Sequence, residues 1–128
     1  METISHRQKY PNRRAYILAH LELINCILPV KTTPREREIL AAFMDKPGER
    51  FSPKNRAAVR QELDMKSANL SKAIRELQAK DFLKEKEDGL LEIHPVIIPT
   101  EGEQKYILTY AFVQEEVQAY QEEDSERD

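Results

Sequence analysis

The residues best suited to chemistry are small or basic side chains clustered in the middle of the chain. They are Lys66, Ser67, Ala68, Asn69, Ser71, Lys72 and Arg75. Asn can form two hydrogen bonds with adenine, Arg and Lys can bind guanine or phosphate, Ser is adaptable, and the Ala methyl group can contact a thymine methyl group. If these residues share one face of a helix, that face is suited to reading the edges of base pairs.

Two further groups of cations could support such a surface. Lys84 and Lys86 are two positions apart, so both point to the same side of a β-strand. Near the N-terminus, four cations are suited to phosphates or to a minor groove. They are Arg7, Lys9, Arg13 and Arg14. The alternative is that these cations only keep the surface solvated, as most charge runs do.

Catalytic chemistry has little support in the sequence. The histidines His6, His20 and His94 are far apart and have no metal-ligand spacing. The single Cys26 lies in an apolar segment, where we expect a buried structural thiol, and it excludes an intrachain disulfide. With only three glycines, the chain has no glycine-rich phosphate loop. We therefore expect no enzyme, no metal site and no cofactor.

Helices must position these residues. The spacing of the apolar residues along the sequence predicts such helices. Residues 15–28 carry a helical apolar stripe that ends at Pro29, although a strand over residues 15–19 is an alternative. Thr33-Pro34-Arg35-Glu36 is typical of a helix start with a capping box, and Pro47-Gly48 ends that helix.

A second pair of helices is predicted around the cluster itself. Ser52-Pro53 repeats the pattern of a cap followed by proline, and the short break Asp64-Met65-Lys66 separates this helix from the next. The next helix covers about residues 67–80. Leu70, Ile74 and Leu77 form its apolar stripe, with the small and basic residues on the opposite face.

The pattern then changes to that of strands. Residues 82–94 predict a β-hairpin with its turn at Asp88-Gly89. After a segment bracketed by Pro95 and Pro99, residues Tyr106–Val113 are almost wholly apolar or aromatic. They predict a strand that is buried on both faces, or on one face with a partner chain on the other.

The charge is distributed unevenly along the chain. The 128 residues have a net charge of −3, which by itself argues mildly against nucleic acid. However, residues 51–86 carry +4 and residues 1–14 carry +3, whereas residues 87–128 carry −10. The total therefore combines a basic body with an acidic C-terminal end, and it does not exclude a nucleic-acid partner.

The stretch from Glu62 to Leu77, followed directly by a hairpin that opens at Phe82-Leu83, resembles bacterial and phage winged helix-turn-helix proteins. MarR-type regulators and plasmid replication initiators share this pattern. The likeness is strong over residues 53–94 and weak back to Thr33. Two positions depart from it, because Asp64 and Asp81 stand where the family usually has Gly; Asp tolerates a left-handed turn, so the turn is expected to survive.

We therefore expect an α+β chain, a mainly helical winged helix-turn-helix with a β-hairpin wing and an additional C-terminal strand. We expect residues 1–14 to form a flexible basic arm and residues 114–128 to form an acidic, disordered tail. The domain between them covers residues 15–113, with its helix-turn-helix at about 53–80 and its wing at 82–94. The resemblance implies sequence-specific binding of double-stranded DNA by a small transcription regulator or a phage or plasmid replication factor.

The alternative function is a protein–protein adaptor with the same fold and no DNA binding, associated with a polymerase or with phage assembly. For partners, we expect double-stranded DNA and a homodimer, for which residues 15–28 and residues 106–113 are the two candidate contact elements. A protein partner is one of the alternatives for the acidic tail. No apolar run approaches the length of a membrane helix and no leader opens the chain. A cytoplasmic location is therefore expected.

Overall fold

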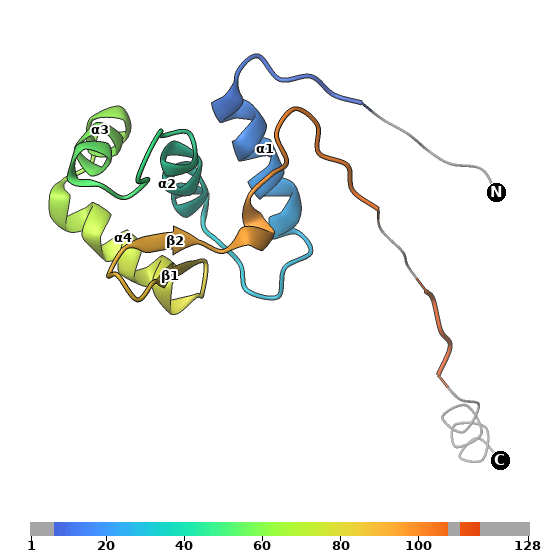
Figure 1. Cartoon of the computed structure of the whole chain (residues 1–128). Coiled ribbons are helices and arrows are strands. Elements are labelled where there is room, and N and C mark those ends of the chain that lie inside the picture. Colours follow the sequence, from blue (N-terminus) through green and yellow to red (C-terminus); the bar gives the residue numbers. More distant parts are fainter. Residues whose placement is uncertain (1–6, 108–110, 116–128) are drawn as a thin grey trace.

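The computed structural model of the chain describes residues 7–107 and 111–115. Within these residues it is an α+β structure, in which four α-helices precede a two-stranded antiparallel hairpin and a short 3-10 helix (Figure 1). The elements are α1 (Arg13–Asn25), α2 (Pro34–Met44), α3 (Pro53–Leu63), α4 (Ser67–Ala79), β1 (Leu83–Glu85), β2 (Leu91–Ile93) and η1 (Pro95–Ile97). This order confirms the α+β class and is compatible with a winged helix.

Helix α1 begins two residues earlier than the apolar stripe predicted. Asn12 caps it, because the Asn12 side chain accepts a hydrogen bond of 2.8 Å from the amide of Ala15. Arg13 and Arg14 are therefore helical and do not belong to a flexible arm, and residues 1–6 of that arm lie outside the described part. The alternative strand over residues 15–19 is wrong.

Helix α2 forms the centre of the core. Its start has the predicted capping box, in which the Thr33 hydroxyl accepts from the amide of Glu36 while the Glu36 carboxylate accepts from the amide of Thr33. Every residue from Ile39 to Met44 is buried. The ring of Phe43 stacks on Phe51 at 4.4 Å between centroids, which joins α2 to the loop that leads into α3.

The two Asp residues at which the family pattern usually has Gly both adopt a left-handed backbone. Asp64 ends α3 with φ of 52°, and Asp81 follows α4 with φ of 66°. Gly is favoured at such positions because it lacks Cβ, and Asp is among the few other residues that adopt them readily. Asp64 therefore forms the turn into α4 without glycine, as the sequence predicted.

The predicted hairpin is confirmed, with short strands. Leu83 pairs with Ile93, Lys84 with Glu92 and Glu85 with Leu91. The amide of Gly89 donates to the Lys86 carbonyl to close the turn, and Gly89 has φ of 84°. Leu83 and Ile93 are both buried, so one face of the hairpin packs on the core beside α4.

The strand predicted over Tyr106–Val113 is absent from its described residues, and residues 108–110 lie outside the description. Ile107 is 93% exposed, Phe112 99% and Val113 85%, so these side chains do not have the predicted burial within the chain. A strand needs a neighbouring strand for its backbone groups, and the hairpin contains the only two strands of the described residues. Of the predicted acidic tail, only Gln114 and Glu115 are described.

The segment after the hairpin returns to α1 and is held there by polar side chains. The Nε2–H group of the buried His20 donates to the carbonyl of Ile97 at 3.1 Å, since a carbonyl can only accept. Nδ1 of His20 therefore accepts from the hydroxyl of Tyr106 at 2.5 Å. The hydroxyl of Tyr16 donates to the carbonyl of Thr100 at 2.6 Å. Residues 97–106 are thus fastened along α1.

The prediction of a buried Cys26 is wrong, because this thiol is exposed. Cys26 lies just past the last turn of α1, two positions after the buried Ile24. Two positions correspond to about 200° of helix rotation, so Cys26 faces away from the core. Its Sγ lies 3.6 Å from the Glu22 carbonyl.

Candidate nucleic-acid interface

Helix α4 has one buried face and one exposed face, as its sequence predicted. Leu70, Ile74 and Leu77 are all at most 3% exposed and pack into the core. The opposite side presents the residues that we call the exposed α4 face. They are Ala68, Asn69, Lys72, Arg75 and the acidic Glu76; Ser67 is exposed because it begins the helix, although it lies on the side of Ile74, and Ser71 is half-buried.

The first turn of α4 differs from those of the other three helices. The side chains of Asn12, Thr33 and Ser52 cap α1, α2 and α3 respectively. The N-cap residue of α4 is Lys66, which makes no capping hydrogen bond. The first amide groups of α4 therefore lack the side-chain acceptor that the other helices have, and the positive end of the helix dipole lies beside the exposed ammonium group of Lys66.

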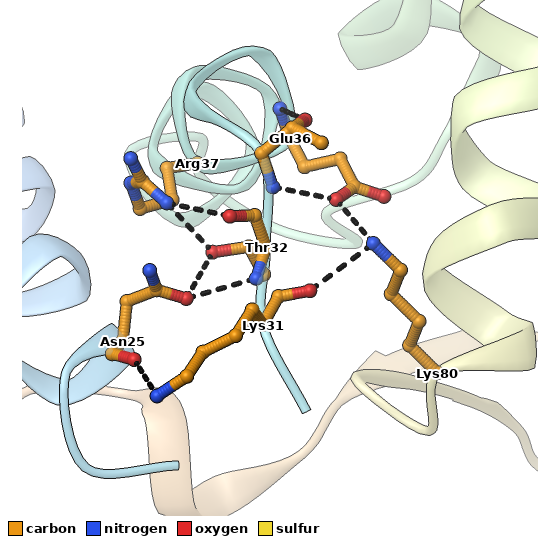
Figure 2. Close-up of polar contacts among 7 residues, drawn as sticks. Asn25, Lys31, Thr32, Glu36, Arg37 and Lys80 are labelled. Atoms are coloured by element: carbon orange, nitrogen blue, oxygen red, sulfur yellow. Dashed lines mark hydrogen bonds and ion pairs between the residues drawn. The ribbon is translucent and has the colours of Figure 1, made fainter. Parts of the chain in front are cut away.

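The far end of α4 is held by an ion pair with α2 (Figure 2). Nζ of Lys80 lies 2.7 Å from Oε1 of the buried Glu36 and 3.1 Å from the carbonyl oxygen of Lys31. Burial raises the pKa of Glu36, but hydrogen bonds from Lys80 and Thr33 outweigh burial, so the pKa is lowered overall. The orientation of α4 is thus set by its apolar stripe together with a charged contact.

The same network extends to α1. The Asn25 side chain accepts from the amide and the hydroxyl of Thr32, at 2.8 and 3.0 Å. Nη1 of Arg37 donates to the Thr32 carbonyl at 2.7 Å (Figure 2). These bonds fix the α1–α2 connection against the helix start that holds Lys80. Sequence reasoning identified Glu36 only as a cap and missed its contact with Lys80, because their sequence separation of 44 positions gives no local signal.

The hairpin carries acids as well as the two predicted cations. Lys84 and Lys86 are both exposed. Glu92 is the cross-strand partner of Lys84, and Glu87 and Asp88 form the tip next to Lys86. Opposite charges at paired positions attract each other. The positive potential of the hairpin is therefore weaker than its two lysines alone suggest.

The predicted cations divide into paired and unpaired groups. Within residues 7–107 and 111–115, no salt bridge is formed by the cations of α4 and of the hairpin, namely Lys66, Lys72, Arg75, Lys84 and Lys86. By contrast, Arg13 binds Glu101 at 2.9 Å, and Arg14 binds Glu62 at 3.1 Å. The unpaired cations are the ones available to an anionic ligand.

The paired arginines bind α1 to neighbouring elements. Arg13 and Arg14 also lie 3.6 and 3.4 Å from the carboxylate of Asp45, just after α2. A hydrogen bond from Lys46, assisted by Arg14, holds the pKa of Glu62 below its usual range although partial burial opposes it. These contacts explain Arg13 and Arg14 structurally, and a role for them at DNA stays a prediction.

In the described residues, no candidate is found for a cluster of metal ligands or for a membrane-spanning helix. Among them, no group of three or more His, Cys, Asp or Glu side chains is placed to hold a metal ion. No helix in this part of the chain is long and apolar enough to cross a membrane. His94 follows β2, and its Nδ1 accepts from the amide of Val96.

Comparisons with known proteins add no relative to these observations. Neither the models of protein families, nor the curated proteins, nor the solved structures contain a match to this chain.

Proposed function

We propose that this chain is a cytoplasmic winged-helix protein that binds double-stranded DNA in a sequence-specific manner, with α4 as the recognition helix. It acts as a small transcription regulator or as a phage or plasmid replication factor. The proposal is supported above all by the exposed α4 face, whose cations Lys72 and Arg75 form no salt bridge within the described residues.

The side chains of this face match the groups that DNA presents. In the proposed complex α4 enters the major groove, where Asn69 from its first turn and Arg75 from its C-terminal half contact base edges. Lys66 and Lys72 bind phosphates on the rims of the groove, together with the uncapped amide groups of the first turn. Lys84 and Lys86 contact the neighbouring backbone, with Glu92 and the acidic tip limiting their contribution.

The experiment is selection of a preferred duplex from a randomised pool, followed by fluorescence polarisation across a series of salt concentrations. We expect saturable binding at about 50 mM salt that weakens as salt rises, because bound cations release counterions from DNA. No binding at the lowest salt concentration contradicts the proposal.

Variants of α4 test whether this helix carries the binding. Replacing Arg75 with Ala should cost about 1–3 kcal/mol of binding free energy on the selected duplex, and Lys72→Ala should weaken binding to all duplexes. Glu76→Ala is the matched control, because it makes the same kind of truncation on the same exposed helix and removes a negative charge. It should leave binding unchanged or tighter, whereas equal weakening by all three variants indicates a general disturbance of α4.

A protein–protein adaptor with the same fold is the second candidate. It is favoured by the nearly complete exposure of Ile107, Phe112 and Val113, because exposed apolar groups commonly mark contact surfaces. The adaptor predicts no salt-dependent affinity for any duplex and a protein that co-purifies with the chain. The acidic C-terminal end is the feature that would bind a basic partner.

A further inference from the structure

Three apolar side chains near the C-terminus are not covered by any of the residues that the structure describes. Ile107, Phe112 and Val113 are the most exposed large apolar residues of the described part, at 93%, 99% and 85%. They belong to residues 107–113, which we call the C-terminal apolar segment and which follow Tyr106. Apolar side chains gathered this densely on one exposed stretch indicate a contact surface.

A groove of matching character lies along α1. Residues 7–12 and residues 98–107 flank this α1 groove, and α1 contributes Tyr16, Ala19 and Leu23 to its lining. Tyr10 lines it from one flank and Tyr106 from the other. Leu23 is 44% exposed and Tyr10 is 40% exposed, so the groove offers apolar and aromatic surface that nothing in the described residues covers.

The charge at the rim of the groove complements the end of the same chain. Arg7 and Arg13 on the rim are paired with Glu103 and Glu101. The rim also holds cations that form no salt bridge within residues 7–107 and 111–115. They are Lys9, Arg50 and Lys105. The apolar residues Phe112 and Val113 are followed by an acidic sequence that starts at Glu115. An apolar stretch followed by acids is the ligand that an apolar groove with a basic rim fits best.

The sequence between Tyr106 and Phe112 disfavours the turn that would bring this segment into the groove of its own chain. Tyr106 is held on α1 by its hydrogen bond to His20 and by ring stacking at 5.8 Å. To reach the same groove, Phe112 would have to reverse direction within Ile107-Leu108-Thr109-Tyr110-Ala111. This sequence contains no Gly, Pro, Asn or Asp and is rich in β-branched and aromatic residues, which favour an extended backbone over a turn.

We infer that the C-terminal apolar segment of one chain occupies the α1 groove of a second copy of this chain. The exchange is reciprocal, so each copy gives one segment and receives one, as a two-fold symmetric dimer requires. This differs from the paired strand that the sequence suggested, and it does not rest on DNA binding.

The test uses the full chain in sedimentation equilibrium. We expect a dimer at about 50 µM that dissociates on dilution. Phe112→Ser combined with Val113→Ser should give a monomer without loss of folding, because both side chains are exposed in the single chain. Leu23→Glu, which places a carboxylate in the α1 groove, should also give a monomer. Circular dichroism verifies the fold of each variant.

Mixing the two variants distinguishes a second copy from other occupants. The Leu23→Glu chain keeps an intact segment and the Phe112/Val113 variant keeps an intact groove, so the mixture should regain dimers through one intact contact per pair. A wild-type chain that is monomeric at about 50 µM overturns the inference. So does a wild-type dimer that both variants leave intact, because its interface then lies elsewhere. Failure of the mixture to regain dimers also contradicts the reciprocal exchange.

Discussion

Nζ of Lys80 lies 2.7 Å from Oε1 of Glu36, and this contact joins the end of α4 to the first turn of α2. The Glu36 oxygen that accepts from Lys80 also accepts from the amide of Thr33. One carboxylate therefore caps α2 and anchors α4. Glu36 is buried, whereas the Lys80 side chain is 31% exposed, so the pair lies at the edge of the core.

Acid should weaken the contact between Glu36 and Lys80. Because hydrogen bonds lower the pKa of Glu36 in spite of its burial, the folded chain releases this proton more readily than the unfolded chain. The stabilisation is therefore present above about pH 4.5 and is lost as pH falls through the folded pKa. Urea unfolding between pH 7 and pH 3 should show this decrease. Other carboxylates also titrate there, so the decrease needs a matched variant.

Glu36→Gln is that variant, since its amide oxygen can still accept from Thr33 but carries no charge for Lys80. We expect a loss of about 1–2 kcal/mol at neutral pH, less than for a fully buried pair because water reaches Lys80. The variant should also lose less stability on acidification than the wild type. Parallel curves for the two proteins would show that the Lys80 contact contributes nothing.

His20 should produce a separate pH dependence closer to neutrality. Burial lowers its pKa from the ordinary value of 6.5, and the hydrogen bond to Ile97 opposes this only in part. The unfolded chain therefore binds this proton first, and stability should fall as pH drops below about 6.5. Thermal unfolding at pH 7.5 and 5.5 measures the difference. His20→Gln, which keeps an N–H donor for Ile97 and does not titrate, should show a smaller shift in Tm.

Replacing either of the two left-handed Asp residues with glycine should increase the stability of the fold. Asp64→Gly and Asp81→Gly should each stabilise the fold by about 0.5–1 kcal/mol, because glycine adopts φ of 52° or 66° without a Cβ clash. Asp64→Asn should be nearly neutral, whereas Asp64→Val should destabilise by more than 1 kcal/mol. Chemical denaturation measures all four variants. A loss of stability in both glycine variants would mean that the Asp side chains make contacts that outweigh their backbone strain.

Substitutions at neighbouring positions of α4 should affect either the stability of the fold or the binding of DNA, but not both. Ile74→Ala should cost about 2–4 kcal/mol of unfolding free energy, because Ile74 is 3% exposed within the core. Arg75→Ala, at the next position, should change stability by less than about 0.5 kcal/mol. Thermal unfolding tests both, and a large loss with Arg75→Ala would place that side chain in the structural rather than the binding part of α4.

The roles proposed for Asn69 and Lys72 differ in their dependence on salt. Lys72→Ala should reduce the slope of log binding constant against log salt concentration by about 1, because one phosphate contact is lost. Asn69→Ala should leave this slope unchanged but reduce discrimination between the selected duplex and one altered at a single A·T pair. Equal slopes for wild type and Lys72→Ala would remove Lys72 from the phosphate contacts.

Local signals predicted the elements around α4 well. Leu70, Ile74 and Leu77 have a spacing that admits only one buried helix face, and Thr33-Pro34-Glu36 satisfies the amide groups of a helix start by itself. Asp88-Gly89 supplies the positive φ that the hairpin turn requires. In each case the residues that decide the structure are within a few positions of one another.

The errors concern residues whose environment is set from a distance. Cys26 is the exception, because its offset of two positions from the buried Ile24 is a local signal that turns it away from the apolar stripe. Arg13 and Arg14 looked like free cations because their partners Asp45 and Glu62 are on other elements. The segment 106–113 has the composition of a strand, yet its described residues pair with neither strand of the hairpin. Composition predicts what a segment can bury, and only the fold decides whether a partner is present.

The hydrogen bond between His20 and Ile97 has a consequence for the order of folding. It joins residues 77 positions apart, whereas α1 packs against α2 and α2 packs against α3, each the next helix in the chain. Contacts between distant residues require the closure of a long loop, which is slow compared with the assembly of adjacent helices. The helices should therefore assemble first, and the segment that follows the hairpin should dock on α1 last. Substitutions in this contact should then accelerate unfolding and leave the folding rate almost unchanged.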